Sequence, residues 1–195
     1  MRLPDGLTTR AATARDAHDI YRLIAACELD LDGMVEIEHD DLVAELDRPA
    51  LDLARDTLLV HDAAGELVGW AEVFKARKAE CDVHPRLRGR GIGAELLAWT
   101  ETCAQAQGST RVSQTVTDND KAAASLFERS GYRPTDTAWI LEIAMAEEPP
   151  ASAPPDGIMI RTYEAGRDDR AAYRLIEDAF GEWPDRMPAT FEEWA

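Results

Sequence analysis

Residues 83–97 read Val-His-Pro-Arg-Leu-Arg-Gly-Arg-Gly-Ile-Gly-Ala-Glu-Leu-Leu. A β-branched residue and a proline, then three glycines and a leucine-rich run, predict the end of a strand, a tight turn and the start of a helix. The first amides of a helix have no intrahelical partner, and the helix dipole favours negative charge there. Because three arginines, at positions 86, 88 and 90, stand in the same turn, we predict a site for an anion such as a pyrophosphate.

Other interpretations of these glycines fit less well. The spacing of Gly89, Gly91 and Ala94 satisfies the dinucleotide-binding fingerprint, but that motif follows the first strand of a parallel sheet and needs an acid about 20 residues later. No acid occurs in residues 105–115, and no Gly-Lys-Ser or Gly-Lys-Thr follows as in a P-loop. A tight turn without a ligand would explain the glycines but not the interleaved arginines.

The whole chain is acidic. Its 195 residues carry 38 acidic and 21 basic side chains, a net charge of −17, with 45% hydrophobic and 30% charged residues. This composition predicts a soluble protein of one domain and part of another, and the charge argues against nucleic acid or an anionic membrane as the main partner. No apolar run approaches the ~18–20 residues of a membrane span. The N-terminal residues do not resemble a secretory signal, so we expect a cytoplasmic protein.

The acidic charge is concentrated in one stretch. Between Glu28 and Asp47 the sequence has nine acidic residues and no Lys or Arg. Such a stretch favours a cationic ligand. A solvated acidic surface is the alternative.

The cysteines give no sign of a metal cage. Cys27, Cys81 and Cys103 stand alone, and the four histidines show no metal-ligand spacing. We therefore predict buried thiols and no structural metal.

Hydrophobic periodicity predicts a mixed α/β plan. An N-terminal strand and two helices come first, then an antiparallel run of strands that includes a hairpin, then a β-α-β-α-β succession. The expected strands are 7–13, 56–61, 67–74, 79–84, 111–117 and one within 132–145, and the expected helices are 14–28, 39–48, 91–107 and 120–130.

A proline-rich segment predicts a domain boundary. Residues 147–157 contain four of the ten prolines and predict a stiff linker between a first domain, 1–146, and a remainder, 158–195. So short a remainder cannot form a core unaided. It must dock on the first domain, pair with another chain as in a homodimer, or belong to a longer protein.

The remainder repeats the beginning of the chain. Residues 157–161 resemble residues 6–10, and the tetrapeptide Tyr-Arg-Leu-Ile at 173–176 repeats 21–24. Strand, gap and helix recur in the same order, which predicts an internal duplication. The second copy stops before it reaches its own glycine-rich segment.

Two motifs resemble the GCN5-related N-acetyltransferase (GNAT) family. The central motif of the family is Arg/Gln-x-x-Gly-x-Gly/Ala, and Arg88, Gly91 and Gly93 match it. The second motif of the family is Asn-x-x-Ala-x-x-Leu-Tyr-x-x-x-Gly-Phe. It resembles the segment Asp120-Lys-Ala-Ala-Ala-Ser-Leu-Phe-Glu-Arg-Ser-Gly-Tyr132. The resemblance covers about residues 7–146. With the duplicated start it extends to tandem, mycothiol synthase-like members, the second domain being incomplete here. It implies the α/β fold of that family, a central mixed sheet with helices on both faces.

The resemblance implies acetyl-coenzyme A (acetyl-CoA) as cofactor and acetyl donor. In GNAT proteins backbone amides hold the pyrophosphate, the pantetheine arm lies along a strand edge like an added strand, and a strand amide, that of Val83 or a neighbour, polarises the thioester carbonyl. The family's asparagine falls on Asp120, beside Asn119. The cofactor-binding residues implied are Cys81, Asp82, Val83, Arg88, Gly89, Arg90, Gly91, Ile92, Gly93, Ala94, Asn119 and Phe127.

A base is expected on the strand before the glycines. An acceptor ammonium must lose a proton before it attacks a thioester, and a carboxylate can accept it, directly or through water. Strand alternation puts Glu80, Asp82 and His84 on one face. We expect Glu80 to be the base, with Asp82 beside it. Polar residues on a wet sheet face are the alternative.

The family's proton donor is replaced. Phe127 stands where GNAT proteins often have a tyrosine that protonates the departing thiolate. Either Ser125, Tyr132 or water takes that role, or the domain binds the cofactor without efficient turnover.

In the proteins that this chain resembles, the region of residues 28–47 walls the acceptor site, so we hypothesise that the acidic stretch selects a small-molecule amine of cationic character. The sequence therefore predicts an N-acetyltransferase that moves an acetyl group from acetyl-CoA to a primary amine by direct attack on the thioester. The alternative is a non-catalytic acetyl-CoA-binding or regulatory domain of a tandem protein. A third hypothesis is an interaction module whose tail recruits a partner.

Overall fold

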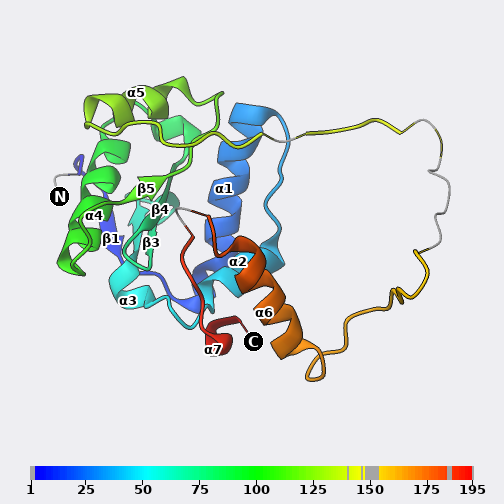
Figure 1. The fold of residues 1–195 in the computed structure, drawn as a ribbon. Coiled ribbons are helices and arrows are strands. Elements are labelled where there is room, and N and C mark those ends of the chain that lie inside the picture. The colour runs from blue at the N-terminus through cyan, green and yellow to red at the C-terminus, as the bar shows by residue number, and fades with distance from the viewer. Residues whose placement is uncertain (1–2, 140, 146, 148–153, 184–185, 195) are drawn as a thin grey trace. The chain divides into compact units, whose positions relative to one another are not determined.

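A computed structural model of the chain describes residues 3–139, 141–145, 147, 154–183 and 186–194 (Figure 1). The chain divides into two units, residues 1–133 and residues 134–195. The first unit therefore ends upstream of the proline-rich segment.

A five-stranded sheet forms the centre of the first unit. Its spatial order is β1-β2-β3-β4-β5; the first four strands are antiparallel, and β5 runs parallel to β4. The hairpin between the second and third strands is as predicted. The strands are β1 (Thr8–Arg10), β2 (Thr57–His61), β3 (Leu67–Phe74), β4 (Lys78–Val83) and β5 (Ser113–Gln114).

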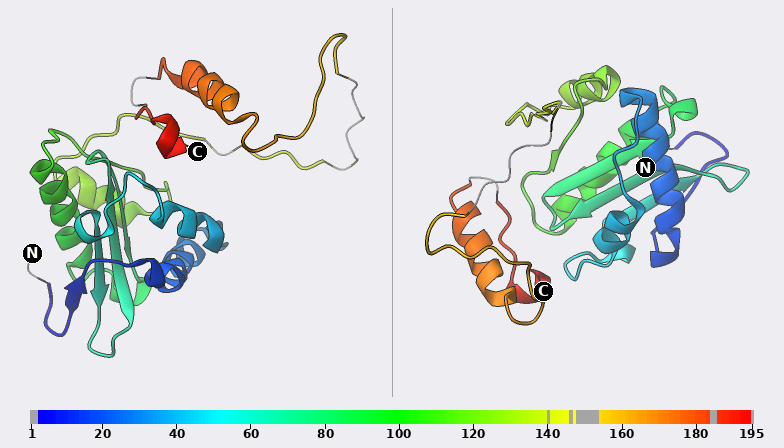
Figure 2. Two further views of the ribbon diagram at one scale, coloured as in Figure 1. Left: turned by 90° about the horizontal axis from the view of Figure 1, so that it is seen from below. Right: turned by 90° about the vertical axis from the view of Figure 1, so that its right-hand side faces the viewer.

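Helices cover both faces of this sheet. Two views show α1 and α2 on one side of the strands and α4 on the other (Figures 1 and 2). The predicted helices are confirmed, and the first is longer than expected because it continues to a left-handed Gly33. The helices are η1 (Ala14–Asp16), α1 (Ala17–Asp32), α2 (His39–Leu46), α3 (Leu53–Asp56), η2 (Pro85–Leu87), α4 (Ile92–Ala106) and α5 (Lys121–Arg129).

The core lies in two layers, one on each face of the sheet. Leu59 and Trp70 are opposite each other in the β2–β3 register and pack with the buried face of α1. Leu58, one residue along, packs on the other side with Ile92 and Leu96 of α4. Because successive side chains of a strand point to opposite faces, the strand sequence decides which helix each residue meets.

An arginine–carboxylate pair joins the first strand to the first helices. The Nη1 and Nη2 atoms of Arg10 lie 2.8 and 2.5 Å from the carboxylate oxygens of Asp16, which also accepts a hydrogen bond from the backbone N–H of Thr13. The guanidinium lowers the pKa of the Asp16 carboxyl well below its usual range. Such a bidentate pair fixes geometry better than a single contact does.

The same contact recurs in the second unit. Arg161 donates to both carboxylate oxygens of Asp168, at 2.5 and 2.6 Å, just before helix α6 (Asp169–Phe180). The offsets from Arg10 and Asp16 are 151 (161 − 10) and 152 (168 − 16), the same two offsets that relate the repeated sequences. The last helix of the unit is α7 (Phe191–Trp194).

Two predicted strands are wrong for the residues that the structure describes. Residues 132–139 and 141–145 contain no strand, and neither do residues 157–161. Their apolar side chains are exposed; Trp139 is 77% and Leu141 90% accessible. Alternation shows that a segment has an apolar face, but a strand also needs a neighbour for its backbone hydrogen bonds, and in the described chain these segments have none.

The predicted strand at 111–117 is much shorter in the structure. Only Ser113 and Gln114 pair with β4, as partners of Lys78 and Ala79. Among the residues that the structure describes, none pairs with the rest of β4 on that side.

Candidate active site

The outer edge of β4 is open beyond Ala79. The backbone N–H of His84 donates to the carbonyl of Val68 at 3.0 Å, which makes these two residues a hydrogen-bonded pair across β3 and β4. Since hydrogen-bonded and non-hydrogen-bonded pairs alternate in an antiparallel ladder, the N–H groups of Cys81 and Val83 point away from β3. They face the open edge, where an extended ligand can add as a further strand.

A turn of backbone amides follows this edge directly. The Arg88 N–H donates to the Pro85 carbonyl at 3.3 Å, and the Glu95 N–H donates to the Gly91 carbonyl at 3.2 Å. The amides of residues 89–94 lie between them, in the glycine-rich turn and the first turn of α4. Because the helix begins at Ile92, these amides have no helical carbonyl four residues before them. Gly89 and Gly91 have φ of +74° and +90°, which non-glycine residues rarely adopt. This amide turn fits a pyrophosphate.

Two of the predicted cofactor-binding side chains are tied to the end of α1: Arg88 of the central motif and Asn119, the residue before the second motif. Arg88 donates from Nη1 to Asp30 at 2.8 Å and from Nε to the Val83 carbonyl at 3.2 Å. Asn119 donates from Nδ2 to Asp32 at 2.5 Å. Its neighbour Asp120 instead caps α5. Arg90 is exposed.

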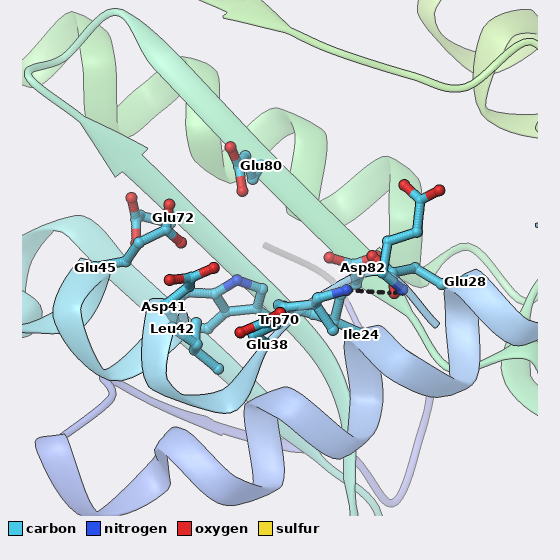
Figure 3. Close-up of a pocket in the computed structure, with 12 residues that line it drawn as sticks. Ile24, Glu28, Glu38, Asp41, Leu42, Glu45, Trp70, Glu72, Glu80 and Asp82 are labelled. Carbon is cyan, nitrogen blue, oxygen red and sulfur yellow. Dashed lines mark hydrogen bonds between the residues drawn. The ribbon is translucent and has the colours of Figure 1, made fainter. Parts of the chain in front are cut away.

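On the α1 face, a cavity of about 360 Å³ lies beside β4 (Figure 3). Eight carboxylates line it and no lysine or arginine does: three from the sheet and five from the acidic stretch between Glu28 and Asp47. Figure 3 shows Glu80 of β4 on one side of this space and Glu38 and Asp41 on the other. The lining residues are Ile24, Glu28, Glu36, Ile37, Glu38, Asp41, Leu42, Glu45, Trp70, Glu72, Glu80 and Asp82.

The sheet carboxylates share one face, as strand alternation predicts for β4. Glu80 is paired in register with Glu72, and Asp82 with Trp70. Glu80 lies 3.1 Å from the Lys78 ammonium. His84 does not line the cavity; its Nδ1 accepts a hydrogen bond from the Arg86 N–H.

Burial perturbs two of these carboxyl groups. Glu72 is 6% exposed, and desolvation raises its pKa to about 7 although Arg48 Nη2 lies 2.9 Å away. Desolvation and the charge of Glu80 raise the pKa of Asp82 to about 6. Both groups therefore exchange protons near neutral pH. Sequence reasoning missed Glu72, whose signal is a single charge inside the apolar run Leu67–Phe74.

The second motif places the Tyr132 ring near Phe127 and contains one further hydroxyl, that of Ser125. The backbone N–H of Tyr132 donates to the Phe127 carbonyl at 3.0 Å, and the two rings lie 5.3 Å apart. The Tyr132 hydroxyl is buried without a hydrogen-bond partner among the described residues, and desolvation raises its pKa to about 12. The Ser125 hydroxyl accepts from Arg129 Nη1 at 2.6 Å.

The described residues contain neither a candidate membrane span nor a candidate metal cluster. None of their helices is long and apolar enough to cross a membrane. No cluster of three or more His, Cys, Asp or Glu side chains among them is arranged to hold a metal ion.

Comparison with known proteins gives consistent matches. Residues 17–132 match the profile of the acetyltransferase (GNAT) family. A mycothiol acetyltransferase of Sanguibacter keddieii is 30% identical over 91% of this chain and 58% of its own length, and one of Nocardia farcinica is 32% identical over 91% and 57%. The chain spans about half the length of the curated relatives that it matches.

Solved structures show the same fold. A GCN5-related N-acetyltransferase from Sphaerobacter thermophilus is 34% identical, with a TM-score of 0.76 over 99% of this chain and 63% of that one. The yncA protein of Salmonella typhimurium, solved with its cofactor acetyl-CoA, is 19% identical, with a TM-score of 0.54 over 68% and 82%. These matches confirm the predicted α/β fold with a central mixed sheet.

Glu72 should make the protein less stable as the pH rises. The pKa of Glu72 is about 7 in the folded protein, against an ordinary value of 4.5. Between these two pH values the folded state binds more protons than the unfolded chain. The stabilisation that protonated Glu72 provides therefore falls as the pH rises and is lost as the pH passes the folded pKa. The difference between the two pKa values corresponds to roughly 3 kcal/mol of the free energy of unfolding at most. Urea unfolding at several pH values should show a fall in the free energy of unfolding across this window that Glu72→Gln reduces.

The same substitution on the exposed side of α5, Glu128→Gln, is the matched control and should keep the wild-type slope. An unchanged slope in Glu72→Gln would contradict the assignment.

Proposed function

Because the chain belongs to the GNAT family of acetyltransferases, we propose that it transfers an acetyl group from acetyl-CoA to a primary amine. One observation carries the proposal: the open edge of β4 ends in the amide turn of residues 89–94 and borders the acid-lined cavity. A donor site and an acceptor site thus meet at one strand end.

Acetyl-CoA, when bound, supplies an acetyl thioester. The amides of residues 89–94 would hold its pyrophosphate, and the open edge at Cys81 and Val83 would hold its pantetheine arm by backbone hydrogen bonds. The Val83 N–H faces that edge and would donate to the thioester carbonyl, where negative charge develops. These roles need backbone geometry, which accounts for glycines at the two turn positions with positive φ.

The acid-lined cavity would take the amine. Eight carboxylates produce a negative potential that attracts an ammonium group and raises its local concentration. A cationic acceptor, with a positive charge besides the reacting amine, would gain most from this potential. The relatives named mycothiol acetyltransferase supply only the reaction class.

We propose Asp82 as the group that accepts the amine's proton, ahead of Glu80. Asp82 adjoins the open edge at Val83, and its pKa of about 6 suits a base at neutral pH. Glu80, the first choice from the sequence, lies against Lys78 and points into the same cavity. The ammonium first gives one proton to the carboxylate. The nitrogen then forms a bond to the acetyl carbon, the carbon–sulfur bond breaks, and the second proton lost by the nitrogen balances the one gained by the thiolate.

The departing thiolate needs a proton that Phe127 cannot give. Ser125 accepts a hydrogen bond from Arg129, which leaves its own hydroxyl hydrogen free to be donated. The buried Tyr132 hydroxyl is the second candidate. The replacement of the tyrosine by Phe127 also favours the alternative function, a domain that binds acetyl-CoA without turnover.

We also infer that the second unit begins a second domain of the same kind. The Arg161–Asp168 pair reproduces the Arg10–Asp16 pair at the offsets of the repeated sequence. In tandem proteins one domain can catalyse while the other supports the fold, so the two functional alternatives apply to the first unit separately.

Replacing Gly91 tests the cofactor site. Gly91→Ala should reduce acetyl-CoA affinity at least about tenfold in calorimetry, because the turn needs a positive φ and close approach of backbone to ligand. Gly108→Ala is the matched control, since its φ is +83° and, as at Gly91, an added Cβ would meet no atom within 4 Å. Each variant should lose about 1–2 kcal/mol of stability from strain. Undiminished affinity in Gly91→Ala would refute the amide turn as the pyrophosphate site.

Coenzyme A release over a panel of amines tests the reaction. At low salt, kcat/KM should be about tenfold higher for amines with a second positive charge than for neutral amines of equal length, and the difference should shrink as salt screens the cavity. Equal rates would remove the cationic preference but leave the transferase. Binding of acetyl-CoA without release would establish the non-catalytic alternative, and no binding would leave an interaction module.

Two isosteric substitutions decide the base. Asp82→Asn should lower kcat about a hundredfold or more and abolish the fall in rate below about pH 6, as expected for loss of a general base. Glu80→Gln should lower kcat less than about tenfold, because the proton acceptor remains. The reverse order of effects would assign the base to Glu80.

A further inference from the structure

The C-terminal end of α1, residues 28–32, carries three carboxylates that bind three different segments. Glu28 accepts from the backbone N–H groups of Glu36 and Ile37, at 2.8 and 3.0 Å, in the loop that lines the cavity. Asp30 accepts a hydrogen bond from Arg88 of the central motif, and Asp32 accepts one from Asn119, the residue before the second motif. This helix end therefore contacts both the loop that lines the acid-lined cavity and the two predicted cofactor-binding side chains.

We propose that Asp30 and Asp32 are positioning residues for acetyl-CoA: Asp30 orients Arg88 and Asp32 orients Asn119. This inference rests on the proposed function and names residues that neither GNAT motif contains.

Asp30 controls Arg88 through a chain of contacts that ends on β4. Arg88 also donates to the Val83 carbonyl, which accepts a second hydrogen bond from Cys27 Sγ of α1 at 3.4 Å. The guanidinium is thus held at two points, and its remaining N–H groups are directed by that arrangement rather than free to rotate. Asp30 fixes both the direction of Arg88 and the strand end whose N–H faces the open edge.

Asp32 controls which end of the Asn119 carboxamide is presented. An ionised carboxylate only accepts hydrogen bonds, so the NH₂ group of Asn119 must face Asp32. The carboxamide oxygen is then turned away from the carboxylate, as an acceptor for an N–H or O–H of a ligand. Without Asp32 the two ends of the carboxamide would be free to exchange.

Charge alone predicts the opposite effect of these residues. A carboxylate beside an anion site repels the anion, so removing it should strengthen pyrophosphate binding. If Asp30 acts by orienting Arg88, removing it should weaken binding instead. The sign of the change therefore separates positioning from simple electrostatics.

The experiment measures acetyl-CoA affinity by calorimetry and steady-state kinetics for Asp30→Asn. We expect the Kd and the KM for acetyl-CoA to rise about fivefold, the size typical of a partly exposed ion pair, with the KM for the amine unchanged. Asp47→Asn is the matched control: it removes one charge from the same acidic stretch but does not line the cavity, and its Kd should stay equal or fall.

A double-mutant cycle makes the test specific. In an Arg88→Gln background Asp30→Asn should have no further effect on Kd, because its partner is gone. The pair Asp32→Asn and Asn119→Ala should behave in the same way. Melting temperatures of the variants should stay within a few degrees of wild type, about the shift that a surface ion pair causes.

Three outcomes would overturn the inference. The Kd for acetyl-CoA could be unchanged or lower in Asp30→Asn, or Asp30→Asn could weaken binding as much in the Arg88→Gln background as in the wild type. The third is a rise in Kd in Asp47→Asn equal to that in Asp30→Asn. If the wild-type protein does not bind acetyl-CoA at all, the proposed function fails first, so the two failures are distinguishable.

Discussion

The structure depends on where the pairing between β4 and β5 stops. Two pairs of residues, Lys78 with Ser113 and Ala79 with Gln114, hold the strands together, and beyond them no described residue pairs with β4 on that side. The N–H groups of Cys81 and Val83 point to this open edge, where an extended chain can pair with them as a further strand would. The same strand then leads into the amide turn. The N–H groups at the strand edge are therefore followed directly by the N–H groups of residues 89–94.

Charge separates the two sides of this strand end. The acidic stretch and the sheet carboxylates gather in the cavity on the α1 face, while the glycine-rich turn with its arginines lies at the N-terminus of α4. An acidic protein of net charge −17 can thus attract an amine to one side and an anion to the other, because fields act over about the Debye length of 10 Å or less in salt. Asp30 and Asp32 lie between these two sides. Their carboxylates do not line the cavity but accept hydrogen bonds from Arg88 and Asn119.

Much of the fold follows from local patterns. The glycine-rich turn, the β2–β3 hairpin and the faces of β4 were all predictable, since the strand period of two and the special conformations of glycine are properties of short segments. The segment 132–145 shows the limit of such patterns. Trp139 and Leu141 alternate as in a strand, yet they are exposed and unpaired in the described chain.

By itself the sequence determined the motifs, the glycine-rich turn before α4 and the shared face of Glu80 and Asp82, because each depends on residues close together in the chain. Only the tertiary structure decided that β4 opens after Ala79, that Glu72 joins the cavity, and that Asp30 binds Arg88, 58 residues away. The physical reason is that desolvation, hydrogen-bond partners and ion pairs are set by what surrounds a residue in space. Segments distant in the sequence supply those surroundings.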